Sequence, residues 1–99
     1  MVNPLVRPIK TVTDSFATIG AASGLALAAN VQRVNAVFVN DSSETIYLAR
    51  GNVAVIGSGI RLNANGGSYE IDASNLFLGI VNAIATGAAA TLTVSEGAH

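Results

Sequence analysis

The sequence predicts a small all-β protein: an antiparallel β-sandwich or jelly-roll-like barrel of about eight short strands. Short runs of β-branched and aromatic residues are separated by clusters of Gly, Asn, Asp and Ser, the residues that favour turns. Several runs alternate polar and apolar residues, which is the period of a half-buried strand. The sequence shows no regular alternation of strand and helix patterns, so a parallel α/β sheet is disfavoured.

Both prolines lie within residues 1–10, where each fixes φ and removes a backbone donor. We therefore expect an extended N-terminal arm over residues 1–10 and a single β-sandwich domain over residues 11–99. The apolar residues of the arm are Leu5, Val6 and Ile9. Two interpretations stay open: a frayed terminus, or an arm that contacts a neighbouring subunit through these three side chains.

In residues 11–29, Ala and Leu permit a helix, but Gly20, Ser23 and Gly24 argue against a continuous one. We expect strands over residues 15–19 and 25–28, joined by a Gly/Ser turn.

The pattern is clearer after this segment. Residues 33–40 (RVNAVFVN) predict a buried strand, and residues 40–43 predict a turn. In residues 45–49, Ile46 and Leu48 would share one face and Tyr47 the other.

Further strands are expected over residues 53–56, 60–63 and 68–71. Residues 57–59 (GSG) predict a turn, because the later glycine and lysine of a phosphate-binding loop are missing. Asn65-Gly66 predicts a two-residue hairpin.

Two apolar runs complete the chain. Residues 76–86 form one of them, in which Gly79 indicates a bulge or a close backbone approach. Residues 90–95 (ATLTVS) give the clearest strand, with Ala90, Leu92 and Val94 facing inward.

The composition is unusually apolar for a chain of 99 residues. Hydrophobic residues make up 51% and charged residues 11%, whereas soluble domains carry about 25% charged residues. A domain of this size buries only roughly 60–65% of its unfolded surface. We therefore expect part of the apolar surface to meet another chain.

Several function classes are disfavoured. The five basic residues are spread along the chain, so we expect no nucleic-acid partner. Residues 73–95 carry no charge, but Asn, Thr and Gly interrupt them, so we expect no membrane span. Cysteine is absent and His99, the last residue, is the one histidine. We accordingly expect no enzyme, no cofactor and no metal site.

Carboxylates give little support for chemistry. Glu70 and Asp72 fit an exposed strand face better than a glycosidase pair. Asp41 and Glu44 do not match the spacing of an EF-hand loop. Tyr47 and Tyr69, which we expect on outward strand faces, either bind a sugar or a partner protein or cover a sheet edge.

Residues 33–96 carry a resemblance to a known class of proteins. Its elements are Asn40-Asp41-Ser42, Ile46-Tyr47-Leu48, Gly59-Ile60-Arg61-Leu62, Gly66-Gly67, Val81-Asn82-Ala83-Ile84 and Leu92-Thr93-Val94. This stretch resembles small virion-associated structural proteins of tailed bacteriophages, of the head-decoration, minor capsid or tail-accessory type.

The resemblance implies a non-enzymatic virion protein that acts by self-association and by binding to a viral particle. Its implied partners are copies of itself, in a trimer or pentamer by viral analogy, and the major capsid or tail protein. The alternative is a carbohydrate- or receptor-binding β-sandwich module. No catalytic residues come with the resemblance.

Overall fold

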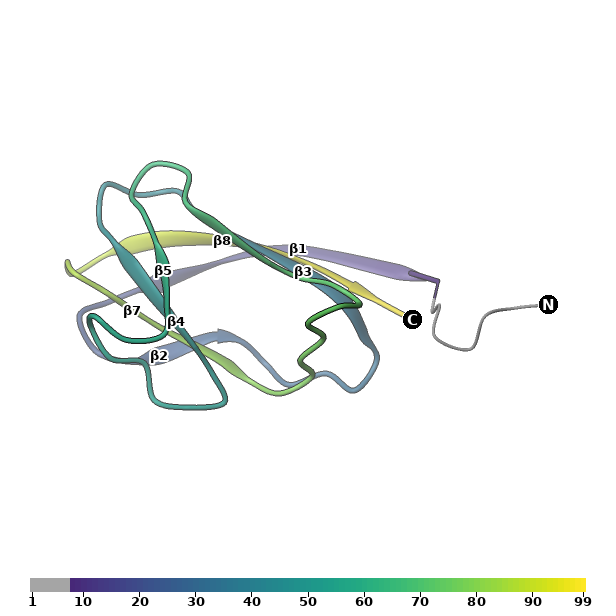
Figure 1. Cartoon of the computed structure of the whole chain (residues 1–99). Helices are drawn as coiled ribbons and strands as arrows, with labels where there is room; N and C mark the ends of the chain where they lie inside the picture. The colour runs from purple at the N-terminus through teal and green to yellow at the C-terminus, as the bar shows by residue number, and fades with distance from the viewer. Residues whose placement is uncertain (1–7) are drawn as a thin grey trace.

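The computed structural model describes residues 8–99, which form two four-stranded antiparallel sheets packed face to face (Figure 1). The strands are β1 (Thr11–Ile19), β2 (Gly24–Leu27), β3 (Arg33–Asn40), β4 (Ile46–Arg50), β5 (Ile60–Leu62), β6 (Ser68–Ile71), β7 (Val81–Ala85) and β8 (Ala90–Ala98). Within residues 8–99 there is no helix, and hence none that could cross a membrane.

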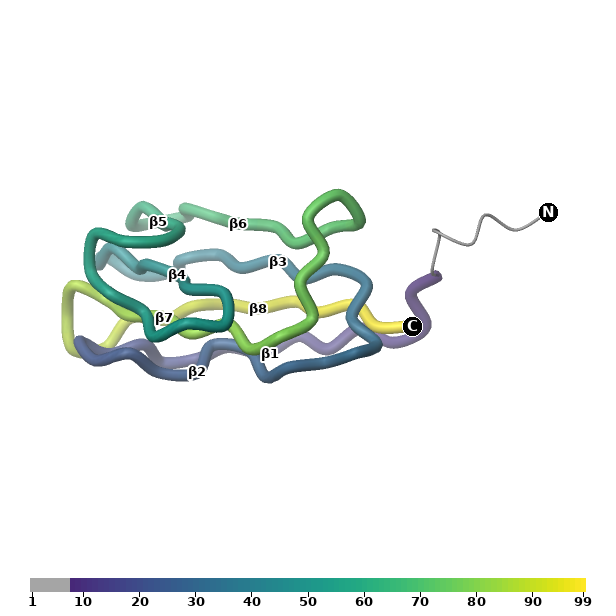
Figure 2. Tube along the Cα trace, turned by 60° about the horizontal axis from the view of Figure 1, so that its bottom comes forward, coloured from purple at the N-terminus to yellow at the C-terminus, as the bar shows by residue number. Residues whose placement is uncertain are grey.

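The first sheet has the order β1-β8-β3-β6 and the second has the order β2-β7-β4-β5. Within the first sheet β1 pairs with β8 and β3 with β6, and within the second sheet β2 pairs with β7 and β4 with β5. The first half of the chain thus pairs with the second half as one long antiparallel ribbon, which is wrapped around a common core. Figure 2 shows the path of this ribbon along the Cα trace. This is the connectivity of a jelly roll. The all-β sandwich expected from the sequence is confirmed.

Alternate side chains from both sheets fill the space between them. Phe38 of β3 and Leu92 of β8 come from the first sheet, and Leu48 of β4 comes from the second; all three are buried. Ala90 and Val94 are also buried beside Leu92, as the alternation in residues 90–95 predicts. The core therefore rests on the two-residue period of the strands.

The strand boundaries follow the pairing rather than local propensity. The prediction for residues 33–40 matches β3, but β1 begins at Thr11 instead of residue 15, and β8 continues to Ala98 instead of residue 95. Both extensions have one cause. The β1–β8 ladder runs in an unbroken register from Thr11↔Ala98 to Ile19↔Ala90.

Two local predictions are wrong. Residues 53–56 form no strand and lie in the connection between β4 and β5. Asn65 and Gly66 form a turn with φ 60° and 118°, but β5 and β6 belong to different sheets, so the turn closes no hairpin. It is bonded to the β3–β4 turn instead: the Asn65 N–H donates to the Ser42 oxygen, at 2.8 Å.

The apolar run over residues 76–86 forms a strand only over Val81–Ala85. The preceding loop places the Phe77 ring against Gly79, where a Cβ would lie 2.8 Å from the ring. The close approach expected at Gly79 is therefore present.

The expected arm lies partly outside the described residues, because Leu5 and Val6 precede residue 8. Residues 8–10 run beside the end of β8. The Lys10 N–H donates to the Ala98 oxygen at 2.7 Å, and His99 Nδ1 lies 3.0 Å from the Pro8 oxygen. Ile9 is 46% exposed and packs over Gly97.

A fully buried arginine begins β3. Arg33 Nε donates to Glu96 Oε2 at 2.6 Å, and its two Nη atoms donate to the carbonyl oxygens of Ala28, Phe77 and Gly79. The guanidinium therefore joins the β2–β3 connection, the β6–β7 connection and β8. A buried charge is tolerated only where such bonds replace its hydration.

A fully buried asparagine ends the same strand. Asn40 Nδ2 donates to the carbonyl oxygens of Glu44 and Leu62, at 2.7 and 3.1 Å, and Asn40 Oδ1 accepts from the Ser42 hydroxyl. This side chain links the first sheet to the β3–β4 turn and to β5. Among the buried side-chain nitrogen and oxygen atoms of residues 8–99, none lacks a partner.

Replacing the buried arginine tests its role. We expect Arg33→Met to lower the free energy of unfolding by roughly 3–5 kcal/mol, because Glu96 and three carbonyl groups would lose their donor. Urea titration measures the loss. The exposed Arg61 of β5 is the control, since Arg61→Met should change the value by less than about 0.5 kcal/mol. Equal free energies of unfolding of the two variants would refute the claim that the buried Arg33 guanidinium stabilises the fold.

Candidate interaction surface

Strand β1 is an edge strand whose side chains are exposed on both faces. Every residue from Thr11 to Phe16 is exposed, whereas Ala17 is half-buried and Ile19 is buried. On the core-facing side of β1, where Thr13 and Ser15 lie, the cause is the second sheet. Its nearest strand, β2, has only four residues, so it covers one end of β1 and leaves the rest open.

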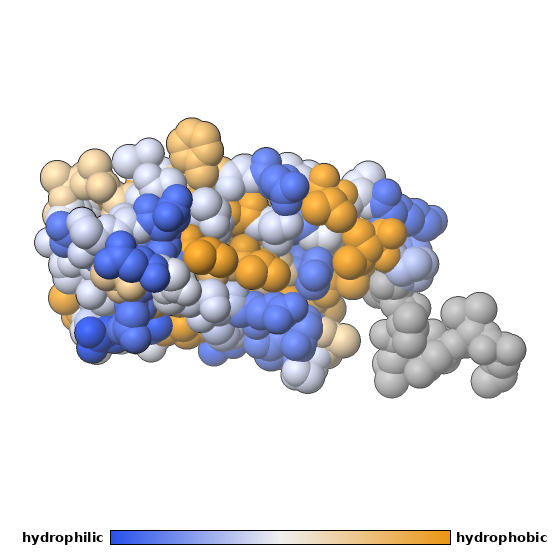
Figure 3. Space-filling model, turned by 90° about the horizontal axis from the view of Figure 1, so that it is seen from above, coloured by the Kyte–Doolittle hydropathy of each residue, from blue (hydrophilic) through white to orange (hydrophobic). Residues whose placement is uncertain are grey.

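The outward face of the first sheet is largely uncharged. In register, Phe16 lies beside Thr93, which lies beside Val39, and Val12 lies beside Gly97. Phe16 is 72% exposed and Val12 is 60% exposed. Asp14 is held on this face by the Ser95 hydroxyl, which donates to its carboxylate at 2.6 Å. Figure 3 looks down on this side of the molecule and shows apolar side chains gathered between polar ones.

A second apolar area lies on the connection between β4 and β5. This connection folds over β7: Asn82 Nδ2 donates to the Asn52 oxygen at 2.8 Å, and the Ala54 N–H donates to Ser23 Oγ at 2.9 Å. Ala54 is buried by this packing. Three large apolar side chains of the same segment are exposed to solvent, namely Val53, Val55 and Ile56.

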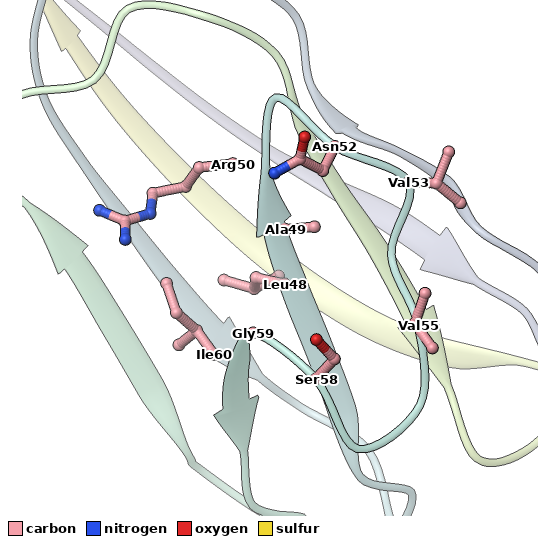
Figure 4. Close-up of a pocket in the computed structure, with 9 residues that line it drawn as sticks. All are labelled: Leu48, Ala49, Arg50, Asn52, Val53, Val55, Ser58, Gly59 and Ile60. Atoms are coloured by element: carbon pink, nitrogen blue, oxygen red, sulfur yellow. The ribbon is translucent and has the colours of Figure 1, made fainter.

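An open hollow lies between the end of β4 and this connection (Figure 4). Its volume is about 290 Å³, at the lower limit of the roughly 300–1,000 Å³ typical of small-molecule sites. Arg50, Asn52 and Ser58 supply its polar groups, and Leu48 and Ile60 are among its apolar lining. The hollow offers hydrogen-bonding groups but no paired carboxylates.

The structure separates the two tyrosines. Tyr47 lies on the outward side of β4 beside Arg61. Tyr69 packs against the core, with its ring 6.5 Å from the Phe38 ring, so the expectation that it faces outward is wrong. Its hydroxyl accepts from Arg50 Nη1 at 3.3 Å and from Asn75 Nδ2 at 3.1 Å. The two rings form no common surface, and Tyr69 serves the packing of the sheet edge.

The carboxylates serve turns and strand ends. Glu44 accepts from the Thr86 hydroxyl at 2.8 Å and lies against Gly87. The Ser74 hydroxyl and N–H both donate to Asp72, and this lowers the pKa of the Asp72 carboxyl. Residues 8–99 bring together no group of three His, Asp or Glu side chains that could hold a metal ion.

Comparison of the chain with known protein families, with curated proteins and with solved structures gave no match. The arm residues Leu5 and Val6 lie outside the described part of the chain, and Ile9 lies beside Gly97, next to β1. Val12 and Phe16 were not among the contact residues predicted from the sequence. Their alternation with Thr and Ser was the signal that could have identified an exposed strand.

Two glycines test how the β4–β5 connection is held. Gly57 and Gly59 both have positive φ, at 83° and 85°. A Cβ on Gly57 would meet open space, whereas one on Gly59 would collide with the carbonyl oxygen of Leu48. We expect Gly57→Ala to cost about 1–2 kcal/mol of unfolding free energy, from the left-handed backbone alone. Gly59→Ala should cost about 1–3 kcal/mol more.

Thermal or urea unfolding of the two variants measures this difference. Similar losses in both variants would show that the Gly59 backbone moves freely away from Leu48.

Proposed function

We propose that this protein is a non-enzymatic structural component of a virion that works by self-association and by binding to the particle. The observation that carries the proposal is the amount of apolar surface left outside a filled core. Ten large apolar side chains within residues 8–99 are at least 40% exposed, although the chain buries a cluster of apolar side chains between the sheets.

Five of these side chains are grouped in two places. Val12 and Phe16 share one face of β1, and Val53, Val55 and Ile56 share one connection on the opposite sheet. Covering a single side chain of this kind contributes roughly 1.5–3 kcal/mol. Apolar area on two sides of a small protein favours a chain that contacts neighbours on both.

The assignment to a virion rests on the resemblance of residues 33–96 to small virion proteins of tailed phages. The jelly-roll connectivity is compatible with it, since viral capsid proteins use this fold. Lectins and cupins use it too, so the fold alone does not choose between functions. The proposed partners are copies of this chain, arranged as a trimer or pentamer, and the major capsid or tail protein.

A carbohydrate- or receptor-binding module remains the alternative. The hollow beside Arg50 and Asn52 offers it polar groups. However, Tyr69 is engaged with Phe38 and Arg50, so Tyr47 would have to act without it. The apolar surfaces therefore support the structural role better.

Mass measurement tests the proposal. We expect light scattering of the purified protein to give a mass that is a multiple of 10.0 kDa and grows with concentration. Particles purified on density gradients from the source culture should contain the chain at a fixed copy number, measured by mass spectrometry. A 10.0 kDa monomer at every concentration, absent from particles, would contradict the proposal.

A further inference from the structure

The open edge of β1 carries backbone groups that no strand of the described chain pairs with. The Asp41 N–H donates to the Thr91 oxygen, at 2.9 Å, so the odd-numbered residues of β8 turn their backbone groups toward β3. The even-numbered residues of β8 therefore face β1, and their partners in β1 are odd-numbered. It follows that the even-numbered residues of β1 turn their N–H and C=O groups outward. These residues are Val12, Asp14, Phe16 and Thr18.

Apart from one charge, that of Asp14, this edge lacks the features that usually keep exposed strands from pairing. Natural edge strands are short, bulged, or protected by Lys and Pro. The nine residues of β1 contain neither Lys nor Pro, and the register with β8 has no shift from Thr11 to Ile19. The outward backbone groups lie beside Val12 and Phe16, two of the most exposed apolar side chains in the described chain.

We propose that a second copy of this chain pairs with β1 in antiparallel fashion across a twofold axis, with Phe16 opposite Phe16 of the other copy. The proposal deepens the self-association proposed above and rests on it. The twofold axis stands perpendicular to the sheet, and the two first sheets become one continuous sheet.

The symmetry limits the possible registers. A twofold axis perpendicular to the sheet keeps each side chain on its own face, so even-numbered residues meet even-numbered residues. A register centred on Asp14 would place two carboxylates directly opposite each other, which is destabilising. A register centred on Val12 would pair Phe16 with Pro8, which has no backbone donor. It would also pair Asp14 with Lys10, whose N–H already donates to the Ala98 oxygen.

The chemistry of the face selects among the remaining registers. Centres at Thr13 and Ser15 would place the Asp14 carboxylate opposite an apolar side chain. The centre at Phe16 instead places Asp14 opposite Thr18 of the second copy, whose hydroxyl can donate to the carboxylate. It also places the two Phe16 rings together, and aromatic cross-strand pairs favour sheet formation. Centres nearer to Ile19 lose pairs because the strand ends there.

This contact is isologous, so it joins two copies and does not by itself close a ring. A trimer or pentamer would use another surface, and the exposed valines of the β4–β5 connection are available for it. The β1 contact would then link one ring to the next.

Disulfide trapping tests the register directly, because the natural chain has no cysteine. Residues opposite each other in a hydrogen-bonded antiparallel pair have Cα atoms about 5.5 Å apart, which suits a disulfide. We expect Phe16→Cys to form a covalent dimer under mild oxidation, and a reductant should reverse it. Val12→Cys is the matched control on the same face. In this register the two copies of residue 12 lie roughly 27 Å apart, eight residues at about 3.4 Å each.

A charge variant measures the same contact without a covalent bond. Phe16→Lys would place two ammonium groups opposite each other, so we expect the dissociation constant of the two-copy unit to rise at least tenfold by sedimentation. Ser43→Lys adds the same charge at an exposed turn and should leave it unchanged.

The outcomes separate this inference from the proposed function. An associating wild type in which Phe16→Cys does not cross-link, or in which Val12→Cys cross-links instead, would overturn the β1 pairing and leave self-association standing. A wild type that stays monomeric at every concentration would overturn both.

Discussion

The central constraint on this fold is the burial of Arg33 at the start of β3. Its guanidinium is fully enclosed, and the ion pair with Glu96 together with three carbonyl groups replaces the water that it loses. These partners come from three segments that are distant in sequence. The β2–β3 and β6–β7 connections at this end of the sandwich are therefore fixed by one side chain, and removal of either charge would leave the other buried without its partner. At the opposite end of the strand the uncharged Asn40 links β3 to the β3–β4 turn and to β5 through two hydrogen bonds to carbonyl oxygens.

With β3 held at both ends, the jelly roll has a well-defined interior and little room for more apolar surface. The sheets differ in extent, because β1 has nine residues and β2, which covers it, has four. The short β2 leaves Thr13 and Ser15 uncovered on the core-facing side of β1. Val12 and Phe16 are exposed because they lie on the outward face of the first sheet, and the β4–β5 connection leaves Val53 and Val55 in solvent. The proposed function rests on these exposed apolar side chains, which we propose are covered by copies of the chain or by a particle.

The sequence predicts the parts of the fold that depend on two-residue alternation. The strand predicted over residues 33–40 and the inward face predicted for Ala90, Leu92 and Val94 are correct. Burial on one face of a strand leaves an alternation of apolar and polar residues in the sequence. Residues 53–56 were predicted as a strand because they are apolar. However, the Ala54 N–H donates to Ser23 rather than to a strand, and all their side chains except Ala54 face solvent. The Asn65-Gly66 turn was predicted, but no local pattern in the sequence indicates that it bonds to the β3–β4 turn.

Arg33 appears in the sequence as one of five scattered basic residues, and its burial depends on segments up to 63 positions away. The exposure of the core-facing side of β1 likewise depends on the length of β2, a strand of the other sheet.

Amide hydrogen exchange at two protein concentrations tests the central claim most directly. The amides of Thr13, Ser15 and Ala17 face β8 and should be protected at both concentrations. The amides of Asp14, Phe16 and Thr18 face the open edge, so they should exchange fast in dilute solution and slowly at high concentration. Fast exchange of these three amides at every concentration would contradict the account.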